Sequence, residues 1–155
     1  MKMHLLSQAR ERAGAPAREY GLAVLTAMTA AEVYAEARPA AAHGFYSAIG
    51  RRLATLVDLS DVHDIEGLAD RINRLWSACG CGQARLQAVD TGIKITHRGA
   101  PAAIEGDHAG YWAQLFPAIL EGAYDAWFRQ LGSGQALSTR ILHQEGDVIE
   151  LHHGV

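Results

Sequence analysis

The spacing of apolar residues changes from a helical to a strand pattern near residue 80, and that change limits the possible folds more than any other feature. In the first half, apolar residues recur at helical spacing, as Ile65, Leu68 and Ile72 do. Gly80 and Gly82 interrupt this pattern, and apolar and polar residues then alternate one by one, which is typical of half-buried strands. Because helices come first and strands later, we expect an α+β domain.

Three helices are predicted in the first half of the chain. The first spans about residues 20–36 and ends before Pro39, because the residue before a proline avoids the helical region. The second spans 40–56, and the third follows the turn at 58–61 and continues to residue 79. The apolar stripe expected to face the core in the second helix consists of Phe45, Ile49, Leu53 and Leu56.

Four strands and one more helix are predicted in the second half. The strands form two hairpins and span residues 84–89, 93–97, 138–144 and 148–152. Between the hairpins, segment 111–131 is expected to form the strongest helix, which starts or kinks at Pro117. The expected fold class is therefore α+β, with three to four helices plus a long C-terminal helix packed on a small antiparallel sheet of two hairpins.

The length of the chain is that of one ordinary domain. It has 155 residues and a mass of 16.7 kDa, and no segment has the composition of a linker between domains. Residues 1–19 form a polar lead-in that contains Gly14 and Pro16. We expect residues 20–155 to fold as a single domain.

Composition and charge exclude several classes of protein. Apolar residues make up 49% of the chain and charged residues 20%, which excludes a wholly disordered chain. The formal charge of -3 provides no basic excess for nucleic-acid binding. No run approaches the ~18 apolar residues of a membrane span. Gln8, Arg10 and Glu11 occupy the place of a secretory signal's apolar segment, so we expect a cytoplasmic location.

None of the residue patterns that carry known chemistry is complete. The eight histidines are scattered, and Cys79 and Cys81 lack the second pair that a tetrahedral zinc site requires. Ser133 follows a helix, whereas a nucleophile elbow places its serine between a strand and a helix. We therefore expect no catalytic residue, no metal and no cofactor. A small metalloenzyme that uses the two cysteines and distant histidines remains a rival hypothesis.

The aromatic residues of segment 111–131 are candidates for the core or for a subunit interface. At helical spacing such residues usually belong to the core, but this apolar face is wider than a small sheet covers. We therefore expect an oligomer interface on this helix that includes Tyr124, Trp127 and Phe128. Arg51 and Arg52 of the second helix are expected to add polar contacts. The alanine-rich first helix is equally suited to an oligomer contact.

The same segment resembles a known family. Leu120-Glu121-Gly122-Ala123-Tyr124, with Trp127 after it and Trp112 before it, resembles the L-E-G-x-Y-x-x-W helix of the bacterial cellulose synthase D-subunit family. The segment Gly50-Arg51-Arg52-Leu53-Ala54 is similar too, and the likeness covers about residues 20–152. Cys79-Gly80-Cys81-Gly82 departs from the family, which tends towards an aromatic–glycine pair at this place.

The resemblance implies a non-catalytic accessory subunit of bacterial cellulose biosynthesis. Members of the family form a ring-like octamer, a tetramer of dimers, that helps to organise the export and crystalline packing of β-1,4-glucan chains. The implied partners are further copies of the chain, other subunits of the cellulose synthase complex and a companion scaffold protein.

The resemblance also implies that N-terminal segments line passageways through the ring. Five residues of the lead-in are able to hydrogen-bond sugar hydroxyls there: Lys2, His4, Ser7, Gln8 and Arg10. A solvated, frayed terminus is the alternative interpretation of these residues. The family has been described as periplasmic, which conflicts with the cytoplasmic location expected above. The alternative function is a small-molecule-binding sensor domain with an apolar pocket.

Overall fold

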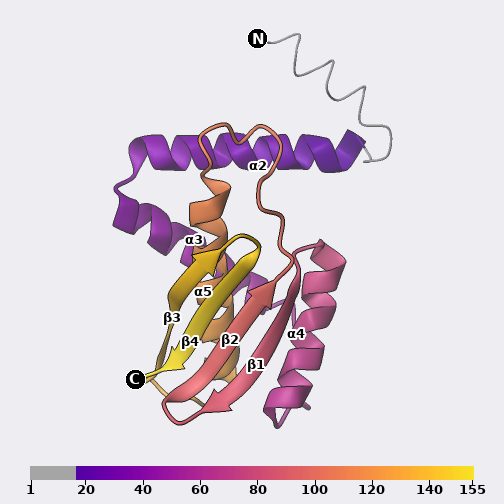
Figure 1. Ribbon diagram of the computed structural model, residues 1–155, viewed down its shortest axis with the longest axis vertical. Coiled ribbons are helices and arrows are strands. Elements are labelled where there is room, and N and C mark those ends of the chain that lie inside the picture. The colour runs from indigo at the N-terminus through magenta and orange to yellow at the C-terminus, as the bar shows by residue number, and fades with distance from the viewer. Residues whose placement is uncertain (1–16) are drawn as a thin grey trace.

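The computed structural model describes residues 17–155, which form four helices and one four-stranded sheet. The elements, in chain order, are α2 (Ala17–Glu36), α3 (Pro39–Ala54), α4 (Ile65–Cys79), β1 (Gln83–Val89), β2 (Gly92–Arg98), α5 (Trp112–Gln130), β3 (Ser138–Glu145) and β4 (Val148–Gly154). Figure 1 shows the strands as one layer, with α5 and α3 behind them. The fold is α+β, as the sequence predicts.

Both predicted hairpins join into one antiparallel sheet in the order β1-β2-β4-β3. The central strands are β2 and β4, in which Ile95 lies opposite Leu151 and both side chains are fully buried. On the opposite face of the sheet, Lys94 forms an ion pair with Glu150 across the same two strands, at 2.9 Å. In β4, buried and partly exposed residues alternate, as expected of a sheet with one covered face, whereas Ile95, Thr96 and His97 of β2 are buried in succession.

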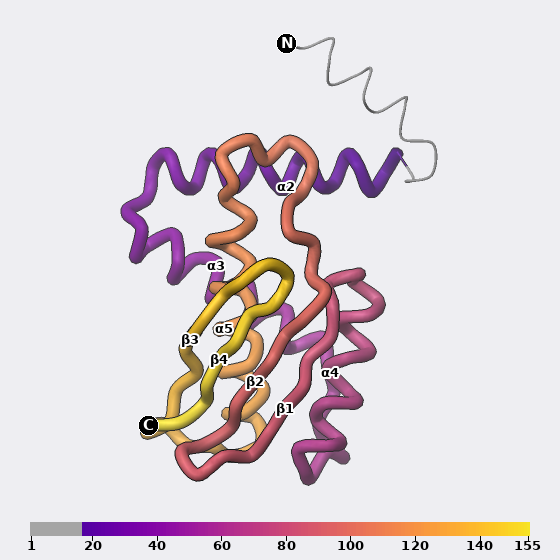
Figure 2. The backbone as a smooth tube through the Cα atoms, viewed as in Figure 1, coloured from indigo at the N-terminus to yellow at the C-terminus, as the bar shows by residue number. Residues whose placement is uncertain are grey.

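The helices lie at different depths behind the sheet. α5 contacts β3 and β4 as well as α3, and α4 packs beside β1. α2 crosses one end of the molecule at a steep angle to the strands, and the connection from β2 to α5 runs beside it (Figure 2). The core therefore lies between the sheet, α4 and α5, whereas α2 lies at its margin.

The structure corrects the description of the aromatic helix as a long C-terminal helix. The β3–β4 hairpin follows α5 and ends the chain, and α5 has 19 residues against 20 in α2. Pro117 lies inside α5 rather than at its start. Because proline has no backbone N–H, the carbonyl of Ala113 receives no helical hydrogen bond from residue 117.

The apolar stripe predicted for α3 is only half right, since Ile49 and Leu53 pack against the core whereas Phe45 and Leu56 are exposed. Phe45 is 47% exposed, and Leu56 lies beyond the helix and is 71% exposed. The buried row consists instead of Ala42, Tyr46, Gly50 and Ala54. A side chain at Gly50 would overlap the backbone of α5 at Ile119, so α3 turns its buried glycine and alanines, together with Tyr46, toward the interior.

Few contacts attach α2 to the rest of the molecule. The Tyr34 ring stacks on Tyr111, with 4.6 Å between the ring centroids, and also on Tyr46 of α3 at 5.9 Å. Gly106, with φ +82°, lets the connection from β2 approach α2 at Val24. These contacts cover only one side of the helix, which already includes Ala17, three residues before the predicted start.

Candidate assembly surface

The three aromatic residues expected at a subunit interface lie in the interior of the chain. Tyr124 and Trp127 are 0% exposed and Phe128 is 3% exposed. The Trp127 indole N–H donates to the carbonyl of Ala54 at 3.1 Å, and its ring packs edge-to-face on Trp76. A neighbouring subunit has no access to these side chains, so any contact between subunits must be made by other residues.

Buried His97 is held by two hydrogen bonds inside this aromatic core. Its Nε2–H donates to the carbonyl of Cys81 at 2.6 Å, so Nδ1 accepts from the Tyr124 hydroxyl at 2.8 Å. Burial lowers the pKa of His97, against the raising effect of the Cys81 hydrogen bond, and burial raises the pKa of Tyr124 far above its usual value. The Trp76 indole N–H interacts with the same phenol without reaching hydrogen-bond geometry. This enclosed pair is structural.

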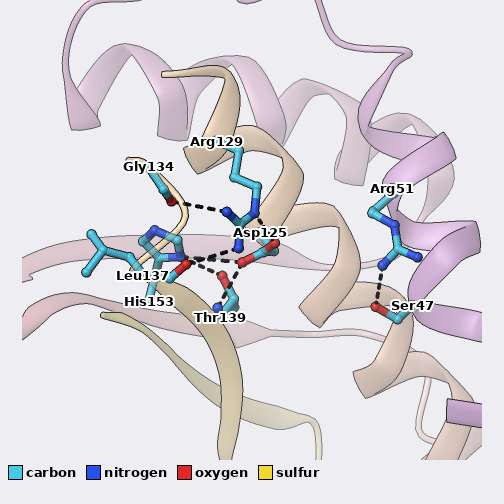
Figure 3. Close-up of polar contacts among 8 residues, drawn as sticks. All are labelled: Ser47, Arg51, Asp125, Arg129, Gly134, Leu137, Thr139 and His153. Atoms are coloured by element: carbon cyan, nitrogen blue, oxygen red, sulfur yellow. Dashed lines mark hydrogen bonds and ion pairs between the residues drawn. The ribbon is translucent and has the colours of Figure 1, made fainter. Parts of the chain in front are cut away.

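A second polar network ties the end of α5 to the last hairpin (Figure 3). Asp125 accepts from the Thr139 backbone N–H at 2.9 Å and from the Arg129 guanidinium at 2.7 Å. Arg129 also donates to the carbonyls of Gly134 and Leu137. The network therefore fixes the connection between α5 and β3.

His153 completes this network from β4. Its Nδ1 lies 2.8 Å from the Thr139 hydroxyl and 3.8 Å from Asp125, and its ring stacks on Phe128. Burial lowers the pKa of His153, and Asp125 partly opposes that shift. A neutral ring with its proton on Nδ1 donates to Thr139 and leaves only the lone pair of Nε2 without a partner.

Arg51 and Arg52, the two predicted polar contacts, are exposed on α3. Arg51 donates to the Ser47 hydroxyl one helical turn earlier, at 3.2 Å, as Figure 3 shows. Both cations are therefore accessible, and their place at an interface stays a prediction. The five predicted glucan-lining residues, from Lys2 to Arg10, lie outside the described residues.

The structure also gives the positions of the two cysteines that were weighed as metal ligands. Cys79 is exposed and Cys81 is half-buried; the Cys81 thiol donates to the Cys79 carbonyl, and burial raises its pKa. Within residues 17–155, no group of three histidine, cysteine or acidic side chains is arranged to hold a metal ion.

A cleft of about 720 Å³ lies between the start of α4 and the end of α5. Apolar side chains such as Leu68 and Phe128 form part of its lining, and Ser60, His63 and Gln130 add polar groups. The cleft is broad and open to solvent, unlike the enclosed apolar pocket that the alternative sensor function requires.

The most unusual surface belongs to α2. Leu22, Leu25 and Met28 are 59%, 65% and 49% exposed, although large apolar residues on a protein surface are usually isolated. Phe45 of α3 is exposed as well. The sequence contained one sign of this surface, because the first helix is apolar and rich in alanine. That composition did not indicate which side of the helix stays uncovered.

The described residues thus form a small α+β domain with an enclosed aromatic interior and an uncovered apolar helix. This chain belongs to the cellulose synthase D-subunit family, whose family model matches residues 14–154. Membership places it in cellulose biosynthesis, with partners among the subunits of the synthase complex. No curated protein matches the chain. None of the described helices is long and apolar enough to cross a membrane.

Proposed function

We propose that this chain is a non-catalytic scaffold subunit of cellulose biosynthesis that forms a ring-like oligomer. The observation that carries the proposal is the uncovered apolar side of α2 in a member of the D-subunit family. Burying a large aliphatic side chain contributes about 1.5–3 kcal/mol relative to leaving it in water. Leu22, Leu25 and Met28 therefore provide a driving force for self-association that the isolated subunit leaves unused.

The oligomer is proposed to organise the export and crystalline packing of β-1,4-glucan chains. In this proposal it is an octamer, a tetramer of dimers, in which N-terminal segments line the passageways through the ring. Lys2, His4, Ser7, Gln8 and Arg10 would meet the glucan there, and Arg51 and Arg52 would add polar contacts between subunits. The enclosed positions of His97 and Tyr124 support a non-catalytic role for the core, because a substrate cannot reach them.

Native mass measured by light scattering tests the proposed assembly. Eight copies of a 16.7-kDa chain have a mass of about 134 kDa, and two copies about 33 kDa. We expect the octamer, which dissociates to dimers on dilution. A protein that stays monomeric at concentrations of about 100 μM, well above the ~1 μM dissociation constant of a modest interface, would contradict the proposal.

The proposed location is the cytoplasmic side of the secretion machinery. Fractionation of cells that carry the tagged chain tests it, with a cytoplasmic and a periplasmic marker protein as controls. Recovery with the periplasmic marker would contradict the cytoplasmic location without bearing on the scaffold role.

A further inference from the structure

The exposed side of α2 carries a regular seam. Its members recur at alternating spacings of four and three residues, and all are exposed: Arg18, Leu22, Leu25, Thr29, Glu32 and Glu36. We call this set the α2 seam. An alternating 4–3 spacing is the pattern with which one helix packs lengthwise against another. On the opposite side of α2, the buried residues Ala27 and Ala30 face the subunit itself.

The middle of the α2 seam is more apolar than the threonines there suggest, because their hydroxyl groups are hydrogen-bonded within the helix. The Thr29 hydroxyl donates to the Leu25 carbonyl at 2.9 Å, and the neighbouring Thr26 hydroxyl donates to the Leu22 carbonyl at 2.7 Å. Both hydroxyl donors are thereby used within the helix. The methyl groups of these threonines extend the surface of Leu22, Leu25 and the adjacent Met28.

The two ends of the seam carry opposite charges. Arg18 lies in the first turn of α2, whereas Glu32 and Glu36 lie near its last turn. Within residues 17–155, none of these three side chains has an ion-pair partner. A parallel pair of α2 helices would place like charges opposite each other at both ends. An antiparallel pair would place each Arg18 opposite acidic residues of the other copy, which is favourable.

From this pattern we propose that α2 is the contact of a two-fold symmetric dimer, in which the seams of two copies pack antiparallel. Aligning all six seam positions places Arg18 of one copy opposite Glu36 of the other, and Leu25 opposite Thr29. The symmetry makes every such contact occur twice. This inference rests on the proposed self-assembly and adds to it the surface, the partner and the orientation.

A charge exchange tests the orientation. Arg18→Glu is expected to raise the dissociation constant of the dimer about tenfold, because two attractive pairs become repulsive. Adding Glu36→Arg restores opposite charges in both pairs and is expected to recover most of the loss. The matched control is Arg74→Glu, an exposed cation on α4, which should leave the constant unchanged. Failure of the second change to rescue the first would overturn the antiparallel alignment.

Disulfide trapping provides a readout that does not depend on affinity. In a Cys79→Ser, Cys81→Ser background, Arg18→Cys together with Glu36→Cys should give covalent dimers on mild oxidation, and Arg18→Cys alone should not. In a parallel pair Arg18 would face itself, so Arg18→Cys alone would also give covalent dimers, and that result would overturn the antiparallel orientation.

The Leu25→Asp variant separates this inference from the proposed function. The expected result is a folded monomer, with its circular dichroism unchanged because Leu25 is exposed in the single chain. An unchanged oligomer would overturn the α2 contact and leave self-assembly through another surface. A wild-type chain that is monomeric would overturn both.

Discussion

Two glycines set the distance between the helices at the centre of the molecule. A side chain at Gly50 would overlap the Ile119 carbonyl of α5, and one at Gly122 would overlap the Ser47 carbonyl of α3. Each helix therefore touches the backbone of the other. Gly122 belongs to the L-E-G-x-Y segment by which the chain resembles its family, so at least one residue of that motif serves helix packing.

Gly122→Ala should destabilise the fold through this contact. The added methyl group meets backbone that cannot rotate away, and overpacking of this kind costs about 1–3 kcal/mol or more. The matched control is Gly44→Ala on α3, where an added Cβ meets no atom within 4 Å. That change should stabilise the helix by about 0.5–1 kcal/mol, because alanine loses less backbone entropy. Denaturant unfolding at one protein concentration measures both, and equal effects would disprove the close contact.

At the scale of elements, two buried histidines connect the sheet to the helices. His97 on β2 bonds to Tyr124 of α5, and His153 on β4 joins the Asp125 network at the end of the same helix. Burial lowers the pKa of both rings. The charged neighbours of His153 have opposite effects on its pKa: Asp125 raises it, whereas Arg129 and His152 lower it.

Acid should therefore weaken the fold in a defined range of pH. In the unfolded chain both histidines titrate near pH 6.5, whereas the folded state holds them neutral to lower pH. The unfolded state thus binds more protons below about pH 6.5, and stability is lost as the pH falls, by up to about 1.4 kcal/mol per pH unit for each histidine. Above about pH 7 these two residues should contribute no pH dependence.

Unfolding free energies measured between pH 5 and 8 test this expectation. His153→Asn should reduce the slope below pH 6.5, whereas His108→Gln, at an exposed position, should leave it unchanged. A slope that His153→Asn does not alter would mean that the ring binds its proton as readily in the folded state as in the unfolded state.

At the scale of the whole molecule, the buried aromatic core and the exposed apolar side of α2 lie in different parts of the protein. The aromatic core joins the sheet to α4 and α5, while the helix α2, which carries the seam, lies at one end of the molecule (Figure 1). A protein built in this way can associate through α2 without rearranging its core. The proposed ring would then depend on surfaces that contribute little to the stability of the single chain.

The proposed glucan contact can be tested independently of assembly. Replacing Lys2, His4, Ser7, Gln8 and Arg10 together by alanine should abolish binding of cello-oligosaccharides in calorimetry and leave the native mass unchanged, because the α2 seam starts at Arg18. The control replaces Arg74 and Arg85, two exposed residues outside the proposed contacts, by alanine, which should not affect the binding of the sugar. Retained binding in the five-residue variant would exclude the lead-in as the glucan contact.

The sequence by itself determined the type and order of the elements, because helix and strand periodicities are local properties. The change of period around Gly80, the two hairpins and the helix between them all agree with the structure. The glycine at residue 80, with φ +63°, ends α4 as expected. The resemblance to the family was recognised largely from local segments such as Leu120 to Trp127, for a similar reason, and the family model matches residues 14–154.

Only the tertiary structure decided which faces are covered. Phe45 and Leu56 fit an apolar stripe as well as Tyr46 does, yet Gly50 and Gly122 bring α3 and α5 so close that the small-residue side of α3 turns inward. The same holds for Trp127, which is buried against Trp76 of α4 and Ala54 of α3, and for Leu25, which stays exposed because α2 lies at the margin of the core. Burial depends on contacts between distant segments, and no local pattern contains them.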